Sequence, residues 1–317
     1  MSSRALAFLG PQRFQPTLAR AVAALGIEGD LATVTAGWQE RELEVEELHE
    51  HLGGRAVNLE LHRRAELVFQ ADPELAAAHH RRQELFREMQ EIYVLRLDAM
   101  LAACVTLDAR PGHAQLLEQE RAAAMDAVRA LDLAHAARIA EVHDEFDARW
   151  HPLDRPALAL QRNEIARLLD GVTAVAIAGG HVAALINRLR MFDVLGLAGE
   201  RPVLAWSGGA MACAARIVLF HDHPPFGSGN AQVLDHGLGL EESLVFLPHA
   251  RRRLDLSDST RTGRLARRFR GSTLAVLEDG AILTWQRGLG WNADDGCLAL
   301  GEDGALTPMR ITIGAVS

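Results

Sequence analysis

The sequence contains no lysine, and all 33 of its basic residues are arginines. Without lysine the chain has neither the amine that forms a Schiff base with a carbonyl substrate nor the phosphate-binding lysine of a P-loop. Cysteine is also scarce, because Cys104, Cys213 and Cys297 are the only three. They are too far apart for a C-x-x-C metal or redox pair, and we interpret them as small buried hydrophobic residues.

Long hydrophobic runs and an excess of positive charge are missing as well. The longest charge-free run, residues 171–187, contains three glycines and a histidine, so it predicts a buried strand and the start of a helix rather than a membrane span. The net charge of −9 gives no general attraction for nucleic acid. The N-terminus lacks the pattern of a signal peptide. We therefore expect a cytoplasmic protein with neither a membrane nor a nucleic acid as partner.

Glycine and proline are absent from two windows, residues 74–110 and 113–151, in which apolar residues recur at helical spacing. A Pro-Gly pair at 111–112 predicts a turn between two long helices. We interpret residues 39–155 as an all-helical insertion, either a lid on the sheet or an arm that assembles subunits. A hairpin of this length presents more apolar surface than one partner helix covers, so we expect a homodimer or higher homo-oligomer formed through it.

The insertion separates residues 1–38 from residues 156–317, and both flanking parts alternate strands with helices. Strands are predicted at 4–9 and 31–36, with helices at 16–25, 156–169 and 182–190. This alternation, with strands that end in glycine, predicts an α/β fold with a mainly parallel, doubly wound sheet. Beyond residue 272, Glu-Asp-Gly turns at 278–280 and 302–304 predict a C-terminal β-hairpin region.

Residues 202–211 (PVLAWSGGAM) form a short apolar run that ends in Ser207 and continues as a potential helix. This pattern is typical of a nucleophile elbow, a tight strand-to-helix turn that projects the serine Oγ and requires small neighbours. Taken alone, it is equally typical of an ordinary turn with an idle serine. A buried strand at 243–249 ends in His249, and Asp222 lies fifteen residues after the serine. Serine, acid and histidine at the ends of separate strands can meet at one edge of a sheet.

Alternatives exist within this site. Asp235 and Glu241 lie in the same region as Asp222 and are alternative candidates for the acid. Upstream, the strand at 171–178 ends in two glycines that open a helix. Amides at such a turn are free to point at an oxyanion, so the expected donors are Gly208 together with Gly180 or His181.

In the order of these motifs along the sequence, the chain resembles the family of serine peptidases that includes aspartyl dipeptidase (peptidase E) and cyanophycinase. The matching segments are GGH at 179–181, AWSGGA at 205–210, Asp222, GLGL at 237–240, PH at 248–249 and RTGRL at 261–265. The resemblance covers residues 171–290, with a looser match at 4–38. Three positions depart from the family pattern: His181 replaces asparagine, Ala205 replaces glycine and Gly208 replaces alanine.

The resemblance implies a class I glutamine amidotransferase-like fold and a serine hydrolase that needs no metal or cofactor. Ser207 would attack a carbonyl, His249 would transfer the proton and Asp222 would orient the imidazole. The implied substrate is a small peptide with an aspartyl or isoaspartyl unit. Its carboxylate would pair with Arg261 and Arg264, unless these are surface charges on an amphipathic helix at 263–269.

Two other classes of function remain open. A metal-dependent hydrolase would use the histidine-rich zone His221, Asp222, His223, Asp235, His236 and His249. Against it, Pro224-Pro225 predicts a loop there and the elbow would have no purpose. A non-catalytic binding or scaffold protein would act through the helical insertion, and His181 and Gly208 favour this reading.

Overall fold

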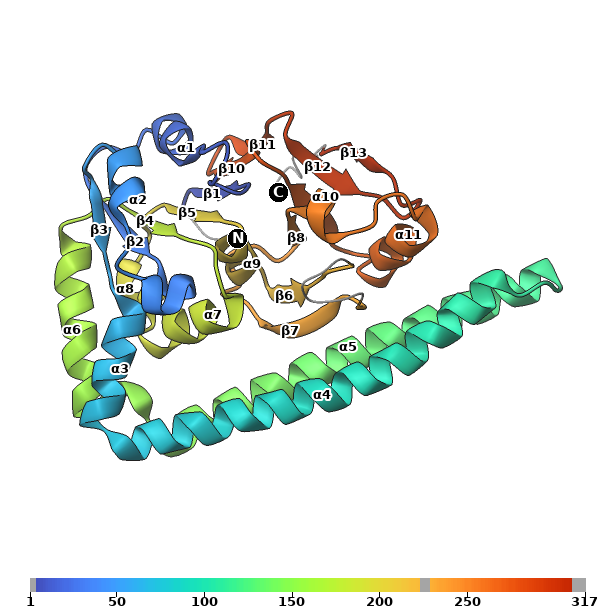
Figure 1. Ribbon diagram of the computed structural model, residues 1–317, viewed down its shortest axis with the longest axis horizontal. Helices are drawn as coiled ribbons and strands as arrows, with labels where there is room; N and C mark the ends of the chain where they lie inside the picture. Colours follow the sequence, from blue (N-terminus) through green and yellow to red (C-terminus); the bar gives the residue numbers. More distant parts are fainter. Residues whose placement is uncertain (1–3, 223–228, 310–317) are drawn as a thin grey trace.

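The computed structural model describes residues 4–222 and 229–309, and its centre is a seven-stranded, mostly parallel sheet (Figure 1). The strand order is β11-β10-β1-β5-β4-β2-β3. Its five parallel members are β1 (Leu6–Leu9), β5 (Val203–Trp206), β4 (Ala174–Ile177), β2 (Leu31–Val34) and β3 (Ala56–Asn58). At one side the antiparallel strands β10 (Ile282–Gln286) and β11 (Gly290–Ala293) continue it. The predicted mixed α/β architecture is confirmed.

Helices cover both faces of this sheet. Side chains alternate between the two faces along each strand, and apolar side chains on both faces pack against helices. Ala7 and Leu9 face a smaller core that includes α1 (Leu18–Ala24) and residues of and next to α2 (Glu46–His51). Leu6 and Phe8 face the larger core on the opposite side. That core is covered by α3 (Leu61–Ala71), α6 (Pro156–Asp170), α7 (Val182–Met191), α8 (Val194–Ala198) and α9 (Gly208–Cys213).

The remaining described strands form two smaller sheets. One has the order β13-β12-β9-β8, formed by β8 (Leu244–Pro248), β9 (Thr273–Leu277), β12 (Cys297–Leu300) and β13 (Leu306–Pro308). The other pairs β6 (Arg216–Leu219) with β7 (Gln232–His236). The short helices α10 (Ala250–Arg253) and α11 (Ser259–Arg268) lie between β8 and β9 in the chain.

Of the two predicted hairpin turns, only one joins paired strands. The turn at 302–304 connects β12 to its antiparallel neighbour β13. The turn at 278–280 instead carries the chain from β9 in one sheet to β10 in another. A Glu-Asp-Gly signal fixes a local reversal, whereas the partner is chosen by packing, and here β10 pairs with the distant β1.

The predicted two-helix hairpin is confirmed as α4 (Pro73–Ala109) and α5 (Ala114–Trp150), each 37 residues long. The expectation that everything from residue 39 to 155 is helical is wrong. Strand β3 lies inside that range and extends the central sheet next to β2. It has three residues, which is too short for an alternating pattern to reveal it.

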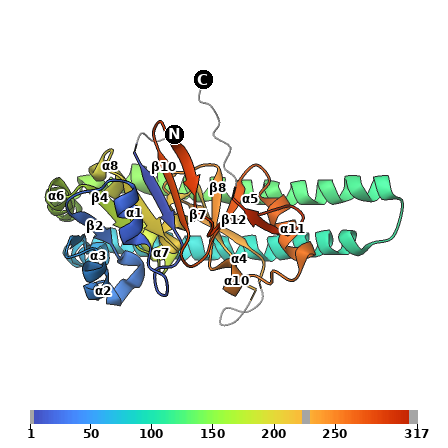
Figure 2. The ribbon, with the colours of Figure 1, turned by 90° about the horizontal axis from the view of Figure 1, so that it is seen from above.

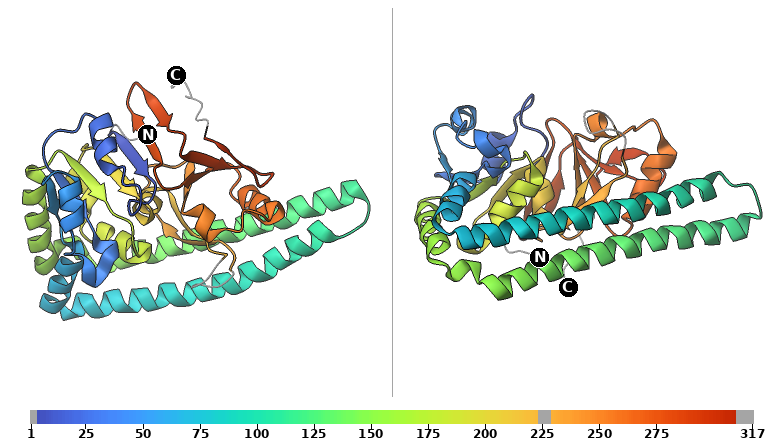
Figure 3. Two further views of the ribbon diagram at one scale, coloured as in Figure 1. Left: turned by 45° about the horizontal axis from the view of Figure 1, so that its top comes forward. Right: turned by 60° about the horizontal axis from the view of Figure 1, so that its bottom comes forward.

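The middle of the hairpin is fixed to the body by a buried polar cluster of Tyr93 on α4, Asp132 on α5 and Arg268 on α11. Both Arg268 Nε and Nη2 donate to the Asp132 carboxylate at 2.7 Å, and the Tyr93 hydroxyl donates to the same carboxylate at 2.8 Å. The Arg268 and Asp132 side chains are 2% and 5% exposed. The hydroxyl of Tyr93 also accepts from the Val233 amide of β7 at 3.1 Å. The hairpin therefore lies firmly along its own protein, as the views from above and below also show (Figures 2 and 3).

The tip of the hairpin extends past α11 (Figure 1). Large apolar side chains on both helices remain exposed, namely Leu85, Ile92, Leu95, Val105, Leu116 and Leu133. Among the residues that the structure describes, no helix combines the length and the apolar character needed to cross a membrane.

Candidate active site

Ser207 occupies a strained turn between β5 and α9, with φ 52° and ψ −121°. A non-glycine residue rarely adopts a positive φ, and such strain is concentrated at functional sites. Two glycines make the close approach possible. A Cβ on Gly179 would lie 2.7 Å from the Ser207 Cβ, and one on Gly209 would lie 2.3 Å from the Ile177 carbonyl oxygen. The predicted strand-to-helix turn is confirmed.

Amides of Gly208 and Gly180 lie beside the serine. A Cβ on Gly208 would be 3.0 Å from the Gly180 carbonyl oxygen and 3.4 Å from the Gly180 nitrogen. Gly208 opens α9, so its amide has no acceptor inside the helix. His181 differs, because its amide already donates to the Gly37 carbonyl at 2.7 Å and its Nδ1 accepts from the Ala184 amide at 3.2 Å. His181 as an oxyanion donor is therefore wrong, and Gly180 is the donor left of the two.

His249 follows β8 directly and has a left-handed backbone with φ 58°. Its half-buried ring has a pKa below the ordinary histidine value, mainly because burial disfavours the charged form and next because Arg253 is close. Asp279 acts in the opposite direction and raises this pKa. The register of β8 and β9, which pairs Pro248 with Leu277, explains why Asp279 is near. One carboxylate oxygen of Asp279, Oδ1, is buried without a hydrogen-bond partner.

Asp222 is not the acid that orients His249. Its Oδ1 accepts from Arg261 Nε at 3.0 Å and Nη2 at 2.5 Å, and its Oδ2 accepts from the Asp255 amide at 3.0 Å. Arg261 also donates to the Gly229 carbonyl at 2.7 Å. The assignment from spacing fails because α11 places an arginine where an imidazole was expected.

Contacts of this kind also exclude the predicted role of Arg261 and Arg264 in binding a substrate carboxylate. Arg261 is paired with Asp222, and Arg264 donates to Asp108 of α4 at 2.8 Å. Both guanidinium groups are held by carboxylates of the chain itself. They fasten α11 to its neighbours, and the prediction that they receive a substrate carboxylate is wrong.

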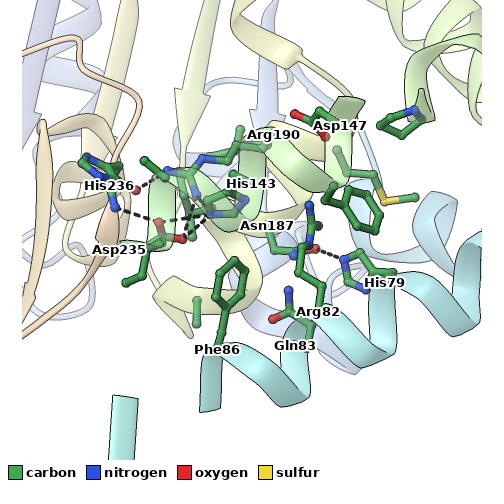
Figure 4. A pocket seen from close by; sticks show the side chains of 18 of the residues that line it. His79, Arg82, Gln83, Phe86, His143, Asp147, Asn187, Arg190, Asp235 and His236 are labelled. Atoms are coloured by element: carbon green, nitrogen blue, oxygen red, sulfur yellow. Dashed lines mark hydrogen bonds and ion pairs between the residues drawn. The ribbon is translucent and has the colours of Figure 1, made fainter. Parts of the chain in front are cut away.

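The alternative acids also lie in other contacts. Asp235 accepts from Arg190 Nη1 at 2.7 Å and lies 3.3 Å from His143 Nε2 (Figure 4). The buried Glu241 accepts from the amide of its neighbour Ser243 at 2.7 Å.

The residues of the proposed metal zone are dispersed in the same way. His236 Nε2 lies 2.9 Å from the Ala136 carbonyl oxygen, away from Asp222 and His249. Within residues 4–222 and 229–309, no three His, Cys, Asp or Glu side chains are grouped to hold a metal ion. His223 lies outside the described residues.

Backbone contacts bring the serine and histidine segments to one edge. The Ser207 amide donates to the Leu9 carbonyl at 3.4 Å, and the next residue, Gly10, donates to Ala281 at 3.0 Å. A Cβ on Gly10 would lie 1.8 Å from the Glu278 carbonyl oxygen, so the 278–281 turn is packed directly on the end of β1. No hydrogen bond joins the Ser207 and His249 side chains in the described part of the chain. Catalytic contacts of this kind are often long without substrate.

Sequence reasoning missed two residues at this edge, Asp279 and Gln39. Asp279 lies in the Glu-Asp-Gly sequence that predicted a turn, so nothing in the sequence indicated a second role for it. Gln39 has φ 56° and ψ −121°, nearly the backbone of Ser207, and lies two residues after Gly37, which packs on the Gly179–Gly180 loop. No local sequence pattern indicates a strained glutamine.

The sequence matches no known protein-family model and no curated protein. Among solved structures, it is similar to a peptidase from an acI-B1 Actinobacterium, with 14% identity over 98% of this chain and 95% of that chain and a TM-score of 0.47. This similarity is too distant to indicate a function.

Proposed function

We propose that the protein is a serine hydrolase that cleaves an amide bond of a small peptide through an acyl-enzyme. The observation that carries the proposal is the strained backbone of Ser207 between glycines that permit the close approach. Such a conformation costs about 1 to 3 kcal/mol and is retained where it serves a function. It holds the hydroxyl clear of the chain at the end of β5.

In the mechanism, Ser207 Oγ attacks the substrate carbonyl while His249 accepts its proton and later delivers it to the leaving amine. The Gly208 and Gly180 amides hold the oxyanion, where one donor contributes about 3 kcal/mol. Asp279 takes the role of the acid in place of Asp222, because its buried, unpartnered oxygen lies near His249. Water then attacks the acyl-enzyme with His249 as base.

An acidic substrate is favoured by the cations that follow His249. Arg252 and Arg253 of α10 both lower the His249 pKa, and neither forms an ion pair with a described carboxylate. Both guanidinium groups lie over aromatic rings, Arg252 over Phe14 and Arg253 over Phe220, and a guanidinium without an ion pair binds a carboxylate well. The aspartyl or isoaspartyl substrate, the peptidase E and cyanophycinase family and the class I glutamine amidotransferase-like fold are proposed together, on the sequence motifs already described.

A fluorophosphonate probe tests the nucleophile. We expect the intact protein to be labelled, Ser207→Ala to be silent and Asp279→Asn to be labelled at least 100-fold more slowly, because the histidine loses its orienting partner. Asp222→Asn is the matched control and should keep most of the rate. Equal rates for Asp279→Asn and the intact protein would remove Asp279 from the mechanism.

A stability measurement tests the strain separately. Glycine accepts φ 52° without penalty, so Ser207→Gly should melt at or above the temperature of Ser207→Ala despite the flexibility of glycine. A Ser207→Gly protein that melts several degrees lower would contradict the strained turn.

A non-catalytic binding protein is the second candidate, and the lack of a described Ser207 to His249 hydrogen bond favours it. In that case the intact protein would stay unlabelled at any probe concentration, while the stability order of the Ser207 variants would be unchanged.

A further inference from the structure

A cavity of about 1380 Å³ lies between the helical hairpin and the body of the protein. It is larger than a typical ligand pocket of about 300 to 1,000 Å³. Most of the walls come from α4, α5, α7 and β7, and residues of α3, α6 and α8 complete them (Figure 4). Of the residues that the sequence suggested for a catalytic or metal site, His181, Asp235 and His236 line this cavity, and Ser207 does not.

Arg82 of α4 is the unusual group in this cavity. Its guanidinium carbon lies 3.8 Å from the centre of the Phe146 ring of α5, which is a close cation–π contact. Its Nε is buried and has no hydrogen-bond partner. No described carboxylate lies within 4.0 Å of it, although Asp147 is close enough to influence its charge. In Figure 4 the side chain extends from α4 between His79 and Phe86.

Several other polar side chains of the cavity are paired with one another. His79 Nε2 lies 3.0 Å from Asn187 Oδ1. Arg190 donates to Asp235, which also contacts His143, and these bonds form the cluster in Figure 4. Arg82 contacts an aromatic ring and, unlike these side chains, has a buried Nε without a hydrogen-bond partner.

Apolar walls surround this cation. Phe69, Phe86, Val94, Ile139, Leu158 and Met191 line the same space. Burial lowers the pKa of Arg82 to about 10, which leaves this partly buried side chain charged at neutral pH. A partly buried guanidinium without an ion pair has lost part of its hydration, and a ligand anion would offset that loss.

We propose that this cavity is a second ligand site, separate from the Ser207 site, which binds a carboxylate attached to an aromatic or aliphatic body through Arg82. A guanidinium stacked on an aromatic ring keeps its outer edge free for bidentate pairing with a carboxylate. Phosphate is disfavoured relative to a carboxylate, because Asp144, Asp147 and Asp235 line the same cavity and repel a dianion more strongly than a single negative charge.

The test uses the full-length protein and calorimetric titration with 3-phenylpropionate, 4-methylpentanoate and inorganic phosphate. We expect one of the two carboxylates to bind with a Kd below 1 mM. Arg82→Gln should weaken the binding at least 10-fold. The affinity of Arg82→Lys should fall in between, because lysine keeps the positive charge but cannot form the bidentate pair of a guanidinium. Arg81→Gln is the matched control on the exposed side of α4 and should leave the Kd within twofold.

The corresponding primary amide of the better carboxylate repeats the test without relying on a variant. It should bind at least 10-fold more weakly than the acid and be insensitive to Arg82→Gln. Lack of binding by both carboxylates up to 10 mM, or equal affinity of the intact protein and Arg82→Gln, would overturn the site. Equal affinity for phosphate would overturn the choice of a carboxylate. Fluorophosphonate labelling of Ser207 is independent of each of these outcomes.

Discussion

Replacing Asp132 by asparagine should destabilise the protein strongly, because it removes the charge that balances a buried arginine. Arg268 is 2% exposed and places two donors on the Asp132 carboxylate at 2.7 Å. Breaking a buried ion pair by removing one partner costs about 3 to 5 kcal/mol. With an unfolding entropy of about 2.1 cal/mol/K per residue, a chain of this length loses about 4 to 8 °C in Tm.

Differential scanning calorimetry at pH 7 measures this shift. The matched control is Asp126→Asn on the same helix, whose exposed pair with Arg129 should be worth less than about 1 kcal/mol. The double variant Asp132→Leu/Arg268→Met should recover at least half of the loss, because neither charge is then buried alone. A Tm for Asp132→Asn within 1 °C of the unaltered protein would refute the reasoning.

Three further predictions concern pH and assembly. Burial lowers the pKa of His135 to about 4, below its unfolded value of about 6.5. The neutral, buried His135 therefore contributes to the free energy of unfolding above pH 6.5, and this contribution is lost as the pH falls toward 4. His135→Gln should flatten urea-measured stability over that range, and the exposed control His80→Gln should not. Arg253→Gln should raise the pKa of His249 and move the acid limb of kcat/KM to higher pH, measured over pH 4 to 8; an unmoved limb would argue against His249 as base. The exposed hairpin face should hold a homodimer that Leu95→Glu dissociates in light scattering, and a monomeric intact protein would contradict the assembly arm.

The sequence predicts elements whose signal is local and long. Two windows without glycine or proline became α4 and α5, and the small residues around Ser207 became the tight turn. Strand β3 was missed because three residues cannot display a period. The site was predicted in part, since Asp222 has a suitable spacing but pairs with Arg261 from a helix 39 residues later. Such a choice between partners depends on tertiary packing, which spacing along the chain does not encode.

The central position of β1 has a consequence for how the chain acquires its structure. Residues 6–9 lie between β5, almost 200 residues later, and β10, about 275 residues later. Contacts this distant in sequence slow the search for the native state, whereas a hairpin of adjacent helices closes quickly. During synthesis, α4 and α5 are complete while the first strand still lacks both neighbours. The elbow turn packs on the end of β1, so the geometry at Ser207 is among the last features to form.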